Sequence, residues 1–162
     1  MYQTPHFRET RPEVLRALMR DHPLATLVTL QDGCPCADHI PLILDPDEGP
    51  NGTLRGHVAR ANPLWRDHDL ATDVLAVFHG PQHYVTPSWY PSKAAHGRVV
   101  PTWNYAVVHA YGTLETVEDT DPLLRHLNAL TASREGARAA PWAVADAPED
   151  FVAAQMKGIV GI

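Results

Sequence analysis

The stretch Gly80–Gly112 places the strongest constraint on how this 162-residue chain can fold. Two β-rich runs, His83–Trp89 and Thr102–Gly112, flank a loop that contains Lys93 and Arg98. Aromatic and β-branched residues favour strands, so we expect two paired strands here. Rings, amides, hydroxyls and cations brought together in this way suit a planar, anionic ligand. The alternative interpretation is that the rings only fill the core of a β-barrel.

Further segments have the composition of strands and are separated by turn signals. They are Leu24–Leu30, Cys36–Leu44, Thr53–Ala59, Val74–Gly80 and a last strand that begins at Gly158. Pro41 lies inside the second of these segments. Because proline cannot donate to a strand ladder, we expect this strand at a sheet edge, at a bulge or against a ligand.

Helical patterns lie mainly at the two ends of the chain. The first is predicted at about residues 10–21, with Thr10 as its cap, Glu13 as the capping-box partner and Pro12 in its first turn. Two more are predicted at about 121–135 and 149–157. Strands joined mostly by turns, with helices at the ends, predict a mainly β, α+β fold. We expect an antiparallel barrel with peripheral helices, forming a single domain over residues 1–162.

Composition argues against several classes of function. Thirteen lysines and arginines against nineteen acidic residues give a net charge of −6, which is unfavourable for a broad nucleic-acid surface. No run reaches membrane-spanning length, the start has no signal-peptide core, and Cys34 and Cys36 are poorly spaced for a disulfide. We therefore expect a cytoplasmic protein. The ten histidines have no metal-ligand spacing, so we expect no metal site.

The segment GHVARANP (Gly56–Pro63) is the sharpest local candidate for a binding site. A strand here runs into a helix N-terminus, whose free N–H groups attract anions. Arg60 adds a guanidinium group that suits phosphate oxygens, and Asn62 can either cap the helix or contact the same anion. The alternative is an ordinary strand-to-helix turn with a solvated arginine.

Two polar residues inside the aromatic stretch are further candidates. Asn104 lies between Trp103 and Tyr105, so its side chain is expected on the opposite face of the strand from these rings. An asparagine in a strand needs a ligand or a buried partner, and Ser88 beside Trp89 presents the same choice. No residue is placed as a catalytic acid, base or nucleophile, and no dinucleotide or phosphate-loop motif is present.

Several long segments, taken together, resemble one protein family. They include Met1-Tyr2 with His6-Phe7, PLATLVT (Pro23–Thr29), HIPL (His39–Leu42), GHVARANP, FHGPQHYVTPSWYPSK (Phe78–Lys93) and VVPTWNYAVVHAYG (Val99–Gly112). The resemblance is to the PaiB-type family, described as FMN-binding negative transcriptional regulators. It implies a flavin-type split β-barrel, similar to that of pyridoxamine-phosphate oxidases and flavin reductases. It also implies a homodimer with FMN at the subunit interface.

The same resemblance implies roles for the candidate residues. Arg60 and Asn62 would contact the phosphate of FMN, while His57 and Val58 would lie along the ribityl chain or the ring edge. The isoalloxazine ring would be lined by the His-Ile-Pro segment, and the pocket closed by residues of the same or the other subunit. The residues that would line the ring are Ile40 and Pro41. The residues that would close the pocket are Ser88, Trp89, Trp103 and Asn104.

Three functions are compatible with these observations. The first is an FMN-binding regulator that acts as a dimer, although the acidic chain and the lack of a recognisable helix-turn-helix give direct DNA binding little support. The second is a flavin-dependent oxidoreductase or flavin reductase with a small-molecule substrate. The third is a cofactor-free dimeric scaffold. In the family the chain continues beyond the strand that begins at Gly158, and if that segment completes the barrel we expect weaker flavin binding here.

Overall fold

A four-stranded antiparallel sheet in the order β2-β1-β6-β7 forms the centre of the fold. The computed structural model describes residues 1–162, and the strands of this sheet are β1 (Leu24–Gln31), β2 (Cys34–Pro41), β6 (Val74–Val85) and β7 (Thr102–Gly112). Asp32 and Gly33 join β1 to β2 with φ values of 51° and 75°. Asp-Gly favours such a tight turn because both residues tolerate positive φ. As Pro41 predicted, β2 is an edge strand.

Two small antiparallel sheets complete the strands. One pairs β3 (Ile43–Asp45) with β4 (Thr53–Arg55), and the other pairs β5 (His57–Ala59) with β8 (Ile159–Gly161). The prediction of one continuous strand over Thr53–Ala59 is therefore wrong, because the chain changes sheets at Gly56. A Cβ atom at Gly56 would lie 2.6 Å from Cδ2 of Leu42 and 3.2 Å from the carbonyl oxygen of Pro41. Only glycine allows so close a crossing.

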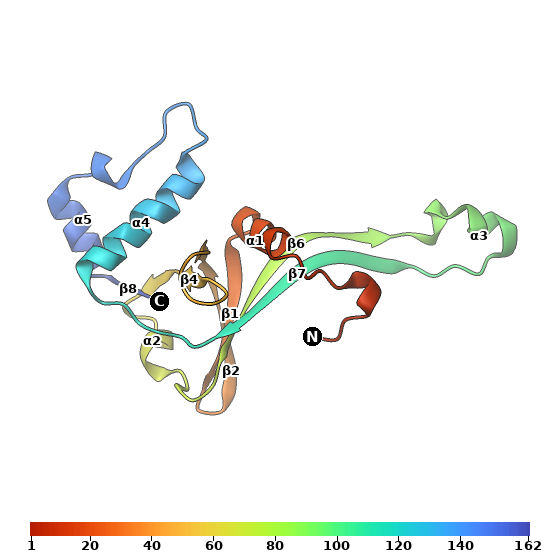
Figure 1. The fold of residues 1–162 in the computed structure, drawn as a ribbon, viewed down its shortest axis with the longest axis horizontal. Helices are drawn as coiled ribbons and strands as arrows, with labels where there is room; N and C mark the ends of the chain where they lie inside the picture. The colour runs from red at the N-terminus through yellow and green to blue at the C-terminus, as the bar shows by residue number, and fades with distance from the viewer.

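The ends of β6 and β7 leave the sheet as a two-stranded ribbon, which we call the arm. Its strands pair from Gln82–Val85 to Thr102–Tyr105, and it ends in η2 (Pro87–Trp89) and α3 (Pro91–His96). Figure 1 shows the arm projecting from the body of the molecule. The prediction of separate strands at Val74–Gly80 and His83–Trp89 is wrong. β6 continues from the first into the start of the second and ends at Val85, while Pro87–Trp89 form η2. A register shift at Gly80-Pro81 accommodates the missing proline N–H.

The helices cover the central sheet and the end of the molecule opposite the arm. The three predicted helices correspond to α1, α4 and α5 to within two residues at each end, and α4 and α5 lie at the end far from α3 (Figure 1). None is long and apolar enough to cross a membrane. The bounds are η1 (Pro5–Phe7), α1 (Pro12–Asp21), α2 (Leu64–Asp67), α4 (Thr120–Glu135), η3 (Val144–Asp146) and α5 (Glu149–Met156).

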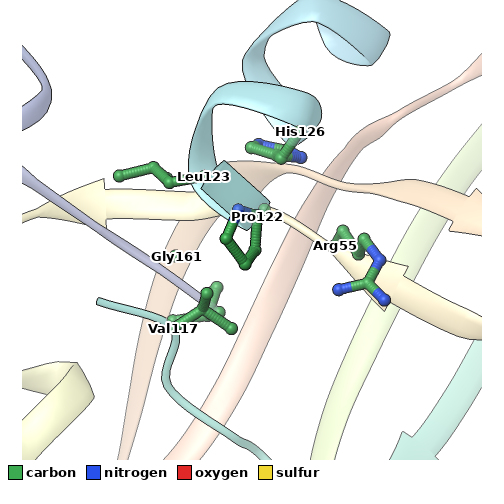
Figure 2. Close-up of a pocket in the computed structure, with 8 residues that line it drawn as sticks. Arg55, Val117, Pro122, Leu123, His126 and Gly161 are labelled. Atoms are coloured by element: carbon green, nitrogen blue, oxygen red, sulfur yellow. The ribbon is translucent and has the colours of Figure 1, made fainter. Parts of the chain in front are cut away.

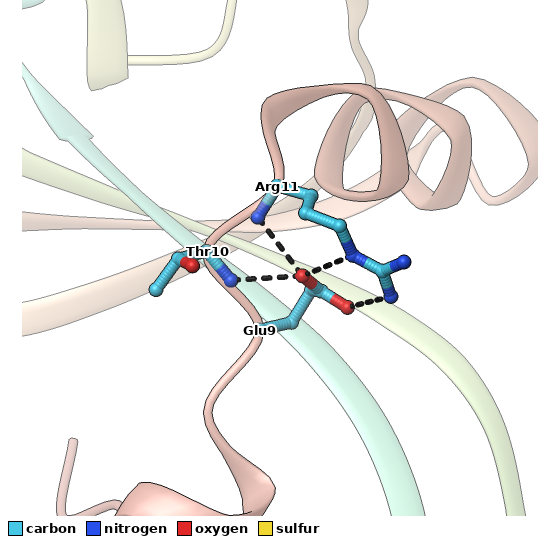
Figure 3. Close-up of polar contacts among 3 residues, drawn as sticks. All are labelled: Glu9, Thr10 and Arg11. Atoms are coloured by element: carbon cyan, nitrogen blue, oxygen red, sulfur yellow. Dashed lines mark hydrogen bonds and ion pairs between the residues drawn. The ribbon is translucent and has the colours of Figure 1, made fainter.

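The start of α1 is stabilised differently from the sequence prediction. Neither Thr10 nor Glu13 forms a capping box, because Arg11 occupies the cap position and makes no side-chain cap bond. Instead, Oε1 of Glu9 accepts the backbone N–H groups of Thr10 and Arg11, each at 2.9 Å (Figure 3). The Arg11 guanidinium also binds this carboxylate, at 2.9 and 2.6 Å. The hydrogen bonds from Arg11 are the main reason that the pKa of Glu9 falls to about 2.

A single cluster of twelve buried apolar residues joins the central sheet to the β5–β8 sheet, and Leu44 of β3 and Leu54 of β4 pack against it. It takes alternate residues from β1 and β6, as expected for strands with one buried face, and it includes Leu64 of α2 and Val160 of β8. The fold is α+β with antiparallel sheets, as predicted. Its strands form three separate hydrogen-bonded sheets and no closed barrel.

Candidate functional site

The start of α2, the strand β5 and the end of β2 meet on one side of the sheet. Oδ1 of Asn62 accepts the N–H of Leu64 at 2.8 Å and so stabilises the start of α2, although the cap position is occupied by Pro63 and not by Asn62 as predicted. Its Nδ2 donates to Oδ1 of Asp38 on β2 at 2.7 Å. This bond and the close crossing at Gly56 hold the HIPL and GHVARANP segments side by side.

Arg60 is anchored to the C-terminal strand. Its Nε donates to the carbonyl oxygen of Lys157 at 3.0 Å and its NH2 group to that of Ile159 at 3.2 Å. Its NH1 group forms an ion pair with Glu118 at 2.6 Å. Three of the five N–H donors of the guanidinium are therefore used within the chain. The other two donors make no hydrogen bond within the chain, and the side chain is 41% exposed.

Ile40 and Val58 belong to the buried cluster and are only 4% and 5% exposed. Their side chains pack in the core. Their main-chain groups point into the ladders, because alternate residues of an antiparallel pair are hydrogen-bonded and Val58 faces Val160 of β8 while Ile40 faces Ala25 of β1. β5 pairs with β8 along one edge and with no strand along the other. The free edge presents main-chain groups next to Pro41, whose side chain is exposed.

His57 projects from β5 on the opposite face from Val58 and contacts a second histidine. Its Nδ1 lies 3.1 Å from Nε2 of His126 on α4, and the two rings meet edge to face. Burial lowers the pKa of His57, and burial together with the charges of His57 and Arg55 lowers the pKa of His126 to about 4. Both rings are therefore neutral at pH 7, and one donates a hydrogen bond to the other.

Sequence analysis did not identify His126 as a candidate. The available signal was its position on the apolar stripe of the predicted helix, three residues after Leu123 and one before Leu127. His126 is only 6% exposed. Its partner His57 is 69 residues away in the sequence, so no local pattern could pair them.

A very small pocket lies beside His126. Figure 2 shows its lining, which includes Arg55 from β4, Val117 and Gly161. Its volume is about 10 Å³, enough for about one water molecule and far too small for a cofactor. Nδ1 of His126 is buried and has no hydrogen-bond partner in the chain. Arg55 forms an ion pair with Glu48.

The remaining candidates lie on the arm. The strand register places Trp103 opposite Tyr84 and Asn104 opposite His83, so Asn104 and Trp103 occupy different faces, as predicted. The hydroxyl of Ser88 accepts a hydrogen bond from Nζ of Lys93 at 3.0 Å. Trp89 and Trp103 are 61% and 54% exposed.

In one chain the candidate residues therefore form two separate groups. The first lies on β2, β5 and the start of α2, and the second lies on the arm at the other end of the molecule (Figure 1). No cluster of three or more histidine, cysteine, aspartate or glutamate side chains is arranged to hold a metal ion.

Comparison with known proteins defines the class of this chain. The family model described as "Putative FMN-binding domain" matches residues 1–162. Protease synthase and sporulation protein PAI 2 of Bacillus subtilis is 33% identical over 161 residues, which cover 99% of this chain and 74% of that protein. An uncharacterized protein of Aspergillus fumigatus is 35% identical over 207 residues, which cover the whole chain and 79% of that protein. The chain belongs to this FMN-binding domain family, whose cofactor is FMN.

Two solved structures share the fold. The FAD and heme binding protein from Mycobacterium smegmatis matches with a TM-score of 0.65 at 21% identity, over 94% of this chain and 65% of that one. A flavocytochrome from Azotobacter vinelandii matches with a TM-score of 0.59 at 14% identity, over 98% of this chain and 70% of that one. At these identities the similarity concerns the fold alone. It confirms the predicted flavin-type split-barrel class, although the strands of this chain do not close a barrel.

Proposed function

We propose that the protein is a homodimer that binds one FMN per subunit at the subunit interface. In this arrangement each site combines the β2–β5–α2 surface of one copy with the arm of the other. The observation that carries the proposal is the separation of the candidate residues into two groups at opposite ends of one chain. In a dimer with two-fold symmetry, the body of each copy faces the arm of the other copy, so the dimer contains two equivalent sites.

The arm itself supports an interface. A two-stranded ribbon is marginally stable alone in water, and this one exposes several large aromatic side chains. Covering them with a second copy removes that apolar area from water. The exposed aromatic residues of the arm are Tyr84, Trp89, Tyr90, Trp103 and Tyr105.

The groups present in the two halves fit FMN. Arg60 has two N–H donors with no partner in the chain for phosphate oxygens, and the free edge of β5, where the main-chain groups of His57 point away from β8, would face the ribityl chain and ring edge, with Val58 beside it. The exposed Pro41 would border the ring, with the buried Ile40 supporting it from the core. The arm would supply aromatic faces from Trp89 and Trp103 and polar contacts from Ser88 and Asn104. Bound FMN supplies electron-transfer chemistry, which the side chains alone do not provide.

We propose that the flavin-loaded dimer acts in the control of gene expression in the cytoplasm. The name of the Bacillus subtilis relative refers to protease synthesis and sporulation, which supports a regulatory role. Cys34 and Cys36 are both free thiols, which favours a reducing compartment. The second candidate is a flavin-dependent oxidoreductase, favoured by the flavocytochrome that shares the fold. Oxidation of NADH or NADPH by the loaded protein would favour the enzyme, and salt-sensitive binding to duplex DNA would favour the regulator.

A subunit-mixing experiment tests the shared site. Arg60→Ala removes a group of the body, and Trp103→Ala removes a group of the arm. We expect each variant alone to bind FMN weakly. When the two variants are mixed and allowed to exchange subunits, half of the dimers are mixed, and each of these has one intact site. Titration should therefore recover about one quarter of the tight sites.

The control for Trp103→Ala is Tyr111→Ala, which removes a similarly exposed ring from the part of β7 outside the arm. It should bind FMN as the unchanged protein does. Sedimentation should show a dimer, and the visible spectrum should show one flavin per subunit. A monomer that binds FMN tightly, or a mixture that recovers no tight sites, would contradict the proposed interface site.

A further inference from the structure

A second pocket, of about 300 Å³, lies between α4, α5 and β5 on the body of the molecule. Eight of its eleven lining residues are hydrophobic. Two large rings border it, Trp142 and Phe151, and they remain 50% and 55% exposed. The volume is at the lower end of the range of ligand pockets, roughly 300–1,000 Å³, and suits a molecule of one or two rings.

The lining excludes a charged occupant. None of the eleven residues is an aspartate, glutamate, lysine or arginine. A charged group that left water for this pocket would lose its hydration without gaining an opposite charge, which is costly. The polar side chains of the lining are His57, Thr131 and Gln155, and they offer hydrogen bonds only.

His57 lines this pocket, and one of its two ring nitrogens has no partner in the chain. Its Nδ1 is occupied by the contact with His126, while its Nε2 makes no hydrogen bond within the chain. The tautomer of His57 follows from the surroundings of its partner, His126. Nδ1 of His126 is buried without a partner beside the small pocket of Figure 2, and a buried N–H without a partner is less favourable than an unpaired acceptor, so we assign the proton of His126 to Nε2. In this assignment Nε2 of His126 donates to Nδ1 of His57, and the proton of His57 lies on its own Nε2.

We propose that this pocket binds a neutral aromatic molecule whose carbonyl oxygen accepts a hydrogen bond from Nε2 of His57. Trp142 and Phe151 contact the ring of the ligand. His126 acts as a positioning residue, because its donated proton keeps Nε2 of His57 a donor. The inference does not depend on the flavin, since the residues that form the pocket are all in place in one chain without it.

Two probes of nearly equal shape test the proposal in the protein without FMN. 4′-Fluoroacetophenone carries the carbonyl acceptor, and 1-ethyl-4-fluorobenzene replaces it with an ethyl group. Fluorine NMR titration should show saturable binding of the ketone, with an affinity about 3–10-fold above that of the ethyl compound, as one neutral hydrogen bond provides. His57→Leu should remove this preference.

Phe151→Ala should weaken the binding of both probes, because it removes a ring that borders the pocket. Its control, Phe7→Ala, removes a 79% exposed ring from η1, outside the pocket, and should change neither affinity. Equal affinities for the two probes, no saturable binding of the ketone, or a preference that survives in His57→Leu would overturn the proposal. Displacement of the ketone by stoichiometric FMN would also overturn it, because the pocket would then belong to the flavin site.

Discussion

Arg60→Ala separates the structural role of this arginine from its proposed role in binding phosphate. The guanidinium makes two hydrogen bonds to main-chain carbonyls beside β8 and one exposed ion pair with Glu118. Each carbonyl bond contributes about 1 kcal/mol. The ion pair, whose side chains are 41% and 55% exposed, contributes roughly 0.2–1 kcal/mol. We therefore expect the free energy of unfolding to fall by about 2–3 kcal/mol.

Urea denaturation of the flavin-free protein measures this loss. The corresponding decrease in Tm is about 5–10 °C for a domain of this size. Glu118→Gln is the matched variant, because it removes the ion pair and leaves both carbonyl bonds in place. It should lower the free energy of unfolding by less than about 1 kcal/mol. An Arg60→Ala protein as stable as the unchanged one would show that these bonds do not stabilise β8 in solution.

Equilibrium dialysis with two flavins then tests the phosphate contact. FMN carries a phosphate and riboflavin does not. Loss of a charged hydrogen bond to phosphate should weaken FMN binding by about 10–100-fold, whereas riboflavin binding should change little. Equal losses for both flavins would refute the phosphate contact and leave Arg60 with a structural role alone.

Three further predictions concern the body of the molecule. His126 binds its proton more weakly when folded, with a pKa of about 4 instead of 6.5, so stability should be full above about pH 6.5 and decrease as the pH falls toward 4. Urea denaturation should show that the free energy of unfolding is about 1–2 kcal/mol lower at pH 5 than at pH 8, and this difference should be absent from His126→Phe. The same pH dependence in that variant would show that His126 is not its source. Gly56→Ala should destabilise the fold by about 1–3 kcal/mol, because the added Cβ would overlap the side chain of Leu42. The control is Gly112→Ala, whose added Cβ would have no atom within 4 Å and should have little effect. Equal effects of the two substitutions would show that the chain around Gly56 moves to make room for the Cβ. Asn62→Ala should cost about 1 kcal/mol through loss of the bond to the start of α2, measured by thermal unfolding, and an unchanged Tm would exclude that role.

Much of the fold was accessible from local sequence patterns. The Asp32-Gly33 turn predicts the β1–β2 hairpin, since few other pairs tolerate positive φ at both positions. Pro41 correctly predicted an edge strand, and the helix ends agree with the proline and apolar patterns to within two residues. The flavin-binding class was also accessible, because long segments of distinctive residues resemble one family over nearly the whole chain.

The positions of the candidate site residues depended on tertiary structure. Sequence reasoning treated Arg60 as a free phosphate ligand, but its partners lie 58 to 99 residues further along the chain. It gave Ile40 and Val58 roles at a ligand, yet their side chains are buried in the core. It did not connect His57 with His126, although burial lowers the pKa of both histidines.

Taken by itself, the sequence determined the types of elements, several of their boundaries and the family, because these depend on each residue and its near neighbours. Only the tertiary structure decided that Gly56 switches the chain between sheets and that the aromatic stretch forms a projecting arm. Such features depend on which distant surfaces bury each other, and hydrophobic burial is not directional along the chain. For the same reason, the sequence did not show that the candidate residues of the body and those of the arm lie apart within one chain.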